Sequence, residues 1–363
     1  MKFVDEFRNS ECSKKLVEKL NNINTEKINI MEVCGTHTMA IFRYGIRDVL
    51  PVNINLISGP GCPVCVTPQS YIDTAITLSE KVDVIIATFG DMMKVPGKKG
   101  SLSVKKAEGA DVRIVYSPMD CLQMASQNPS KKIVFLSVGF ETTAPMAAIT
   151  AIEAKKNNIS NLFFFVAHKI VPPAMEVLVQ DVELKIDGFL LPGHVCAIIG
   201  TKPYELLSRD YNIPAVVTGF EPLDILQGLN TLVSLISKKD YRIYNEYKRI
   251  VKTEGNIYAL EYLNSVFDIV DSSWRGIGRI CGSGLEFNSK YEHFDAIKHF
   301  NINYEEYDGS PRCKCGEILK GKIKPIDCPL FKKICNPENP VGSCMVSSEG
   351  TCAAYYRYHK DTK

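Results

Sequence analysis

The chain has 363 residues, of which 45% are hydrophobic and 23% charged, and its formal net charge is +2. This is the composition of a globular protein too long for one ordinary core, and its charge is too small to attract nucleic acid or anionic lipid. It holds no apolar run of about 18 residues that would span a membrane, and the polar opening MKFVDEFRNSECSKKL is unlike a signal peptide. We therefore expect a cytoplasmic protein of two or three domains, with no nucleic-acid or membrane partner.

Residues 25–235 alternate β-branched runs with helical stretches, which is typical of parallel sheets covered by helices. Several runs are apolar at consecutive positions, as expected for strands that are covered on both faces. The predicted strands are 27–33, 52–58, 82–89, 111–117, 131–138, 162–167, 188–192 and 214–220. Segments 68–81 and 144–157 are amphipathic and predict helices between them. Helical patterns also dominate 241–267, before a tail rich in Pro, Gly and Cys.

Three landmarks recur at nearly one offset, which indicates an internal duplication. The matched pairs are His37 with His168 (131 residues apart), Gly61 with Gly193 (132) and Phe89 with Phe220 (131). We therefore predict an α/β fold of two similar doubly wound parallel-sheet domains, at 25–129 and 130–235. A third, mainly helical and irregular domain is predicted at 236–363, together with the N-terminal residues 1–24, and the family resemblance given below implies that it is an iron–sulfur domain.

The thirteen cysteines are distributed unevenly along the chain. In a reducing compartment, metal binding or catalysis is a better explanation for them than a disulfide framework. Seven lie in residues 1–312, and Cys12, Cys121, Cys196 and Cys281 among these are isolated enough to be structural. Six lie in the next 40 residues, namely Cys313, Cys315, Cys328, Cys335, Cys344 and Cys352. A tail with so little periodicity needs a metal to become ordered.

The first chemical motif is Cys34-Gly35-Thr36-His37, which directly follows a predicted strand and opens a helical stretch. Loops at the carboxyl ends of parallel strands form the binding crevice of open α/β sheets. The start of a helix also favours the thiolate form of Cys34. Cys34 and His37 could therefore ligate one metal or act as a nucleophile–base pair, unless they are a buried thiol and a hydrogen-bonded imidazole.

The second motif is Cys62-Pro63-Val64-Cys65, the one Cys-x-x-Cys of the chain, again between a strand and a helix. This placement is typical of a redox dithiol. Half of a zinc site and a purely structural role are alternatives, although a zinc ribbon would need a second such pair.

Weaker candidates are the acids that follow glycine turns at strand ends, namely Asp91, Glu141 and Glu221. Each is explained equally well as the cap of a helix. The tail spacing Cys313-x14-Cys328-x6-Cys335-x16-Cys352 offers four thiolates, enough for a [4Fe–4S] cluster, with Cys315 and Cys344 left over. Spacing alone does not choose four ligands out of six, nor iron–sulfur over zinc.

The sequence closely resembles the HypD family of hydrogenase maturation factors. The matching segments run from residue 31 to residue 356 and include MEVCGTHT, GPGCPVC, TFGDMMKVPG, SVGFETTAP, LPGHVCAIIG, TGFEP, WRGIG and CMVSSEGTCAAYY. One departure is Lys332, where the family commonly has glycine in the turn before Cys335.

This resemblance implies a scaffold that builds the Fe(CN)2CO unit of [NiFe] hydrogenases with a HypC-type chaperone and a HypE-type cyanide donor. It implies that Cys34 holds Fe(II) carrying cyanide and CO jointly with a cysteine of the chaperone, with His37 adjacent. It also implies a [4Fe–4S] cluster on Cys313, Cys328, Cys335 and Cys352, and a thiol relay at Cys62 and Cys65. Whether turnover makes the protein an enzyme is left open. The competing hypotheses are a cluster-dependent thiol–disulfide reductase and a zinc-stabilised α/β binding protein.

Overall fold

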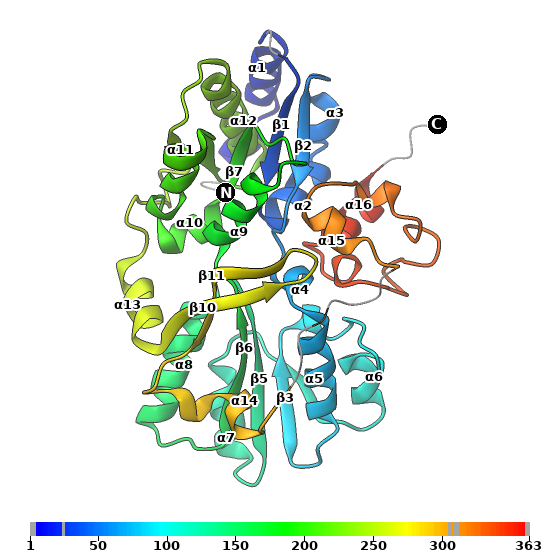
Figure 1. The fold of residues 1–363 in the computed structure, drawn as a ribbon, viewed down its shortest axis with the longest axis vertical. Coiled ribbons are helices and arrows are strands. Elements are labelled where there is room, and N and C mark those ends of the chain that lie inside the picture. The colour runs from blue at the N-terminus through cyan, green and yellow to red at the C-terminus, as the bar shows by residue number, and fades with distance from the viewer. Residues whose placement is uncertain (1–4, 24–25, 304–306, 308–311, 360–363) are drawn as a thin grey trace.

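The computed structural model describes residues 5–23, 26–303, 307 and 312–359. The chain forms two lobes, each around a parallel sheet, and a smaller lobe of residues 312–359, here called the tail lobe, that lies beside their junction (Figure 1). The ends of the predicted third domain, residues 1–4 and 360–363, are outside the described residues.

The upper lobe is built on a five-stranded sheet with the order β2-β1-β7-β8-β9. Its strands, all parallel, are β1 (Ile28–Glu32), β2 (Ile54–Ser58), β7 (Gly188–Pro192), β8 (Ala215–Thr218) and β9 (Ile243–Asn245). The lower lobe has a four-stranded parallel sheet with the order β4-β3-β5-β6. Its strands are β3 (Val84–Thr88), β4 (Val112–Ile114), β5 (Lys132–Gly139) and β6 (Leu162–His168). The predicted α/β class with two parallel sheets is therefore confirmed.

Helices cover both faces of the strands, which explains their continuous apolar runs. In β3, for example, Val84 and Ile86 face a core that extends into the tail lobe, whereas Ile85 and Ala87 face a second core. The helices of the two lobes are α1 (Ser10–Asn21), α2 (Gly35–Arg43), α3 (Ile46–Val49), α4 (Pro63–Val66), α5 (Gln69–Ser79), α6 (Leu102–Ala107), α7 (Asp120–Gln127), α8 (Ala144–Lys156), α9 (Val171–Gln180), α10 (Gly193–Ile199), α11 (Glu205–Tyr211) and α12 (Pro222–Ser237). Short 3-10 helices lie at Asp5–Arg8, Gly90–Met92 and Lys202–Tyr204.

The two sheets do not follow the ranges 25–129 and 130–235. The chain leaves the upper sheet after β2, builds the whole lower sheet and then returns with β7. The sheets share one relative strand order, which makes β1 equivalent to β3, β2 to β4, β7 to β5 and β8 to β6. The offset of about 131 residues instead pairs β1 with β6, an inner with an edge strand. The three recurring landmarks therefore do not mark a structural repeat. The sequence analysis could not detect this, because local patterns do not reveal which sheet a crossover rejoins.

The region after residue 235 also differs from the prediction of one helical domain. Strand β9 joins the upper sheet, and α13 (Ile257–Val266) packs against α8 of the lower lobe. An antiparallel hairpin of β10 (Phe267–Trp274) and β11 (Gly278–Phe287) follows and lies between the lobes (Figure 1). The helix α1 packs on α12 of the upper lobe, while the 3-10 helix Glu292–Phe294 and α14 (Ala296–His299) pack on β6.

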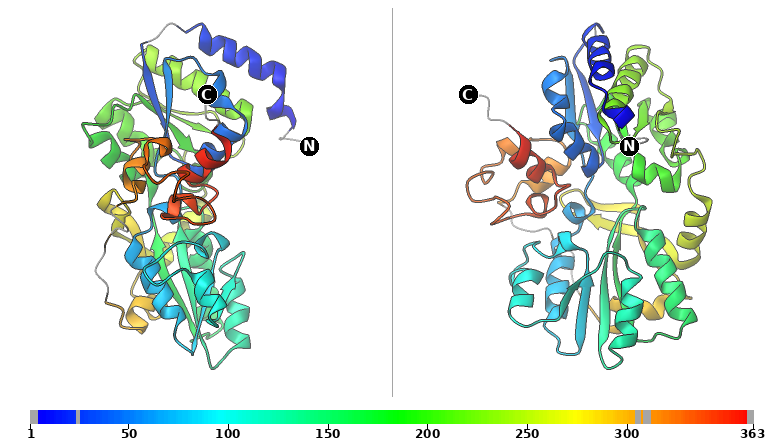
Figure 2. Two further views of the ribbon diagram at one scale, coloured as in Figure 1. Left: turned by 90° about the vertical axis from the view of Figure 1, so that its right-hand side faces the viewer. Right: turned by 180° about the vertical axis from the view of Figure 1, so that it is seen from behind.

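The tail lobe is irregular, as predicted. It contains α15 (Cys315–Leu319), α16 (Thr351–Tyr358) and the 3-10 helices Pro325–Asp327 and Ser343–Met345. Helix α16 packs against α2, so this lobe flanks the loop that follows β1 (Figure 2). Among the described residues, we find no helix whose length and apolar character would allow it to cross a bilayer.

Candidate functional site

The carboxyl ends of the two sheets face one another at the junction of the lobes. Cys34 follows β1 of the upper sheet and Glu141 follows β5 of the lower sheet. Both lie close enough to the buried thiol of Cys196 to influence its ionisation. The strand ends at which the sequence predicts a binding crevice therefore come together where the two lobes join.

Cys34 is the residue before α2 and is 8% exposed. Burial, together with the nearby carboxyl of Glu349, raises the pKa of its thiol to about 12. The backbone amides of Thr36 and His37 oppose this rise without overcoming it. The expectation of a thiolate at the helix start is therefore wrong for the isolated chain, because desolvation outweighs the first-turn dipole. A thiol of this kind loses its proton when a metal replaces it.

The site also contains a buried carboxyl that the sequence analysis did not predict. Glu32, in the last position of β1, accepts hydrogen bonds from the Thr38 hydroxyl at 2.7 Å and from the Cys34 amide at 3.4 Å. Burial raises its pKa to about 7, so it holds a proton for part of the time near neutrality. The sequence did hold a signal for this carboxyl, because Glu32 lies at the end of an apolar strand run. A glutamate is seldom fully buried unless it is paired with another group.

His37, the third residue of α2, is fully buried. Its Nε2 atom lies 3.0 Å from the carbonyl oxygen of Gly219, and its ring packs on Phe220 at 4.6 Å. The Nδ1 atom has no hydrogen-bond partner in the described part of the chain. Because burial lowers the pKa of His37 to about 4, its imidazole is neutral at physiological pH. His37 thus offers an unused lone pair close to Cys34.

Cys62 and Cys65, here called the dithiol, flank the first turn of α4 and are 3% and 0% exposed. The Cys65 amide donates to Cys62 Sγ at 3.2 Å, and both thiols are free. Gly61 presses the loop against the preceding motif, because a Cβ there would lie 2.4 Å from the Cys34 nitrogen. The structure thus brings the first two predicted motifs into direct backbone contact.

A line of sulfur atoms continues from the dithiol into the tail lobe. The side chain of Cys65 contacts that of Cys344, and the Sγ atoms of Cys344 and Cys315 are 2.7 Å apart. Cys315 also contacts Cys313, and Cys344 contacts Cys352. The sequence left Cys315 and Cys344 without a role, since four of the six tail cysteines suffice for a cluster. The fold places them between the dithiol and the two cysteines at the ends of the predicted ligand set.

Three of the four predicted cluster ligands gather in the tail lobe. Cys313 and Cys352 lie near Cys335, whose Sγ accepts from the Val341 amide at 3.3 Å. Cys328 lies in the turn that precedes Cys335, where the Phe331 amide donates to its carbonyl at 3.0 Å. Across the residues that the structure describes, no three His, Cys, Asp or Glu side chains close into a metal site. The donor type suits an iron–sulfur cluster, while the closed ligand geometry is not formed.

Lys332, the departure from the family pattern, has a left-handed backbone with φ +59°. This is the conformation that glycine adopts without a steric cost. The Lys332 amide donates to the Cys335 carbonyl at 3.2 Å, which closes the turn.

The weaker acidic candidates have different roles. Asp91 accepts a hydrogen bond from Ser347 of the tail lobe at 2.7 Å, and Glu221 pairs with Arg8 at 2.5 Å. Glu141 accepts from the Val171 amide at 2.8 Å, and its other carboxyl oxygen is buried with no partner among the residues described. Burial raises the pKa of Glu141 to about 7. Asp91 and Glu221 are explained as structural contacts, whereas Glu141 keeps a free oxygen in the junction.

The fold and this junction define a two-lobed α/β protein with free cysteines clustered where the lobes and the tail lobe meet. The family model HypD, described as "Hydrogenase formation hypA family", matches residues 11–359. The hydrogenase maturation factor HypD of Escherichia coli (strain K12) is 46% identical over 368 residues, covering 99% of each chain. The factors of the same name from Cupriavidus necator and Azotobacter vinelandii are 42% and 41% identical, each over 99% of this chain and 97% of the relative. The chain belongs to the HypD family of hydrogenase maturation factors.

Proposed function

We propose that the protein assembles the Fe(CN)2CO unit of [NiFe] hydrogenases together with a HypC-type chaperone and a HypE-type cyanide donor. The observation that carries the proposal is the placement of Cys34 at the lobe junction, in backbone contact with the dithiol loop at Gly61. The sulfur contacts from Cys65 through Cys344 to Cys315 connect that junction to the tail lobe. A site for one iron ion is thereby joined to groups that can store electrons.

In this proposal Cys34 holds the cargo iron together with a cysteine of the chaperone. Cyanide and CO require a soft, low-spin Fe(II), and a thiolate supplies the electron density that such a centre needs. The buried, protonated thiol of Cys34 releases its proton as the iron binds. The unpaired Nδ1 of neutral His37 lies in the same motif and is available as a ligand or as a proton acceptor.

The remaining electron-handling groups are the dithiol and the tail cysteines. Cys313, Cys328, Cys335 and Cys352 would hold the [4Fe–4S] cluster, which when bound supplies one-electron chemistry. The dithiol stores two electrons and two protons when its disulfide is reduced to two thiols. The protein's own contribution is to exclude water from these sulfurs, since Cys65 and Cys344 are buried.

A thiol–disulfide reductase acting on protein substrates is the second candidate, and the sulfur contacts that end at the dithiol favour it. Against it, Cys62 and Cys65 are almost completely buried, so a protein disulfide could not reach them in this conformation. A zinc-stabilised binding protein is the third candidate. Iron, zinc and acid-labile sulfide analysis of anaerobically purified protein separates it from the others, because zinc without sulfide would exclude the cluster.

The proposal is tested by infrared spectroscopy of the chain co-purified anaerobically with its chaperone partner. Bands of metal-bound cyanide and CO are expected for the unchanged protein and should be lost in Cys34→Ala, with the tail iron and sulfide retained. Cys121→Ala is the matched control, because Cys121 is also buried and its pKa is likewise raised to about 12 by burial. Bands that persist in Cys34→Ala, or that are absent from the unchanged complex, would refute the iron site at Cys34.

A further inference from the structure

The loop between β8 and α12, Thr218-Gly219-Phe220-Glu221, carries the carbonyl oxygen that contacts His37. Gly219 presents this oxygen at 3.0 Å from His37 Nε2. The ring of Phe220 lies against the imidazole, with 4.6 Å between the ring centres. The orientation of the imidazole therefore depends on where this loop is held.

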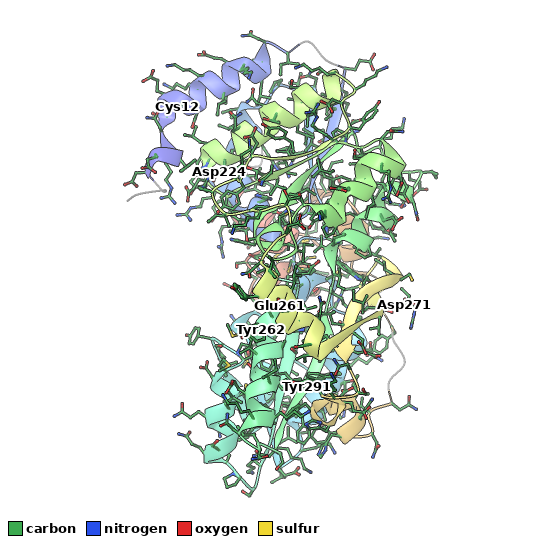
Figure 3. The ribbon with its side chains drawn as sticks, turned by 90° about the vertical axis from the view of Figure 1, so that its left-hand side faces the viewer. Cys12, Asp224, Glu261, Tyr262, Asp271 and Tyr291 are labelled. Carbon is green, nitrogen blue, oxygen red and sulfur yellow. The ribbon has the colours of Figure 1, made fainter. Side chains whose placement is uncertain are left out.

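Asp224, in the first turn of α12 in the upper lobe, holds the loop from the helix side (Figure 3). One of its carboxylate oxygens accepts a hydrogen bond from the Glu221 amide at 3.3 Å. A Cβ on Gly219 would lie 2.3 Å from the same oxygen, so the carboxylate packs directly on the backbone there. The backbone carbonyl of Asp224 accepts from the Thr218 hydroxyl at 2.6 Å. One residue of α12 thus contacts the loop at three of its four positions.

Arg249 in turn holds the carboxylate of Asp224. Its two terminal nitrogens donate to the two carboxylate oxygens, at 2.8 Å and 2.6 Å. The guanidinium also lies over the rings of Phe7 and Tyr247, at 3.9 Å and 4.4 Å from their centres. The Tyr247 ring itself limits the loop, because a Cβ on Gly219 would meet it at 2.8 Å. A lysine could not reproduce this planar contact with two parallel donors.

The simplest explanation of the pair is a stabilised helix start. The Asp224 side chain is, however, only 5% exposed and that of Arg249 25%. Removing such a pair from water costs about as much as its attraction returns, so the pair adds little net stability. The best-attested use of buried charged groups is to select one arrangement among several. The arrangement selected here is the one in which the Gly219 carbonyl faces His37.

We propose that Arg249 and Asp224 are positioning residues for His37, which fix the Gly219 carbonyl so that the imidazole keeps its proton on Nε2 and its lone pair on Nδ1. A carbonyl oxygen can only accept, so it selects the tautomer that donates from Nε2. If the carbonyl moves away, the tautomer with the proton on Nδ1 is no longer disfavoured, and the lone pair at Nδ1 is lost from that fraction of molecules. The inference rests on the proposed function only in giving His37 a task at the iron site.

The experiment is nuclear magnetic resonance of the full-length reduced chain, labelled in its histidine ring nitrogens, near neutral pH and without iron or partners. The chemical shifts of the two ring nitrogens report the tautomer ratio, and His37→Gln identifies the signals of His37. Arg249→Gln removes the charge and the fork of donors, whereas Arg249→Lys keeps the charge. Arg242→Gln is the matched control, because Arg242 pairs with Asp240 through two contacts of 2.8 Å and 2.7 Å at the surface of the same lobe.

In Arg249→Gln we expect the share of the Nδ1–H tautomer of His37 to rise about fivefold or more, as for the loss of one neutral hydrogen bond. Arg249→Lys should lie between Arg249→Gln and the unchanged protein, and Arg242→Gln should match the unchanged protein. His168 is an internal control, because it is buried in the lower lobe with Nδ1 3.5 Å from the Ser137 hydroxyl. Its shifts should stay the same in every variant.

An unchanged tautomer ratio of His37 in Arg249→Gln would overturn the inference. Equal changes at His37 and His168 would also overturn it, because they would report a general loosening of the chain. If Arg249→Gln does not fold, Asp224→Asn takes its place, since it removes the charge at nearly the same size, and an unchanged ratio there would have the same meaning. The measurement needs no iron, so failure of the proposed function, seen as missing cyanide and CO bands, is distinguishable from failure of this inference.

Discussion

The imidazole of His37 donates from Nε2 to the carbonyl oxygen of Gly219 across 3.0 Å, which joins the end of β1 to the end of β8. A carbonyl can only accept, so Nε2 carries the proton and Nδ1 presents a lone pair. The same contact fixes the tautomer before any ligand binds. His37 is thus prepared as a neutral base or ligand by its second nitrogen, in the manner of histidines oriented by a backbone carbonyl.

Replacement of His37 should flatten the acid side of the stability profile. The pKa of His37 is about 4 in the folded chain against a usual value near 6.5, so the unfolded chain binds the proton first as the pH falls. The free energy of unfolding therefore decreases between about pH 6.5 and pH 4, by at most about 3 kcal/mol from this group. His37→Gln should lose less stability across that window in urea unfolding series. His293→Gln, at an exposed position, is the control, and equal slopes for both variants would contradict the prediction.

Glu141 should produce the opposite pH dependence. Burial raises its pKa to about 7, so the folded chain binds its proton more tightly than the unfolded chain does between about pH 4.5 and 7. Its contribution makes the free energy of unfolding fall as the pH rises through that window, again by at most about 3 kcal/mol. Glu141→Gln keeps an oxygen that can accept from the Val171 amide. The variant should gain stability relative to the unchanged protein between pH 5 and pH 8, and a difference independent of pH would disprove this.

A methyl group at Gly61 should disturb the contact between the two motifs. The added Cβ would lie 2.4 Å from the Cys34 nitrogen, so the backbone of one loop must move. We expect Gly61→Ala to reduce the free energy of unfolding by about 1–3 kcal/mol and to speed alkylation of Cys34. Gly90→Ala is the matched control at another strand end, where the Cβ has nothing within 4 Å, and it should change stability by less than about 0.5 kcal/mol. Similar results for both variants would mean that the Gly61 contact does not hold Cys34.

The strands and cysteine motifs of this protein could be predicted from the sequence because the patterns that indicate them are local. The continuous apolar runs of β3 and β5 predicted strands covered on both faces, and Cys34 and Cys62 were expected at the ends of strands, where they lie. The pairing of strands was not readable. The crossovers after β2 and β6 carry the chain between the lobes, and no local pattern distinguishes them from crossovers that stay within one sheet.

The site itself shows the same limit. The sequence singled out Cys34, His37 and the dithiol by spacing, but spacing did not reveal that burial keeps Cys34 protonated. Nor did spacing reveal Glu32, whose only signal in the sequence is its place at the end of an apolar strand run. Cys315 and Cys344 were left over because four thiolates suffice for a cluster, yet their sulfurs, 29 residues apart in the sequence, are in contact. Burial and contacts of this kind depend on residues far apart in the sequence, such as those that pack α16 on α2.

The contact between Cys344 and Cys315 predicts a defect in electron transfer rather than in metal binding. Cys344→Ser removes the sulfur between Cys65 and Cys315 while leaving the four proposed cluster ligands in place. We expect tail iron and sulfide to be retained, and reduction of the Cys62–Cys65 disulfide by a low-potential one-electron donor to slow by roughly tenfold or more. Cys121→Ser, in a buried position away from this line, should behave as the unchanged protein does. Normal reduction in Cys344→Ser would exclude a route through Cys344.

The final prediction concerns the turn that carries Cys335. Lys332 has φ +59°, whereas the neighbouring Lys333 is outside the left-handed region, and both side chains are exposed. A non-glycine residue in that region costs about 1–2 kcal/mol, of which about 0.5–1 kcal/mol is offset when glycine loosens the unfolded chain. Lys332→Gly should therefore stabilise the turn by up to about 1 kcal/mol, while Lys333→Gly should destabilise it by about 0.5–1 kcal/mol. The Cys335 amide, which donates to the Leu330 carbonyl at 2.9 Å, reports the difference by hydrogen exchange. Protection should rise in the first variant and fall in the second, because only at residue 332 does the side chain oppose the backbone that the turn requires.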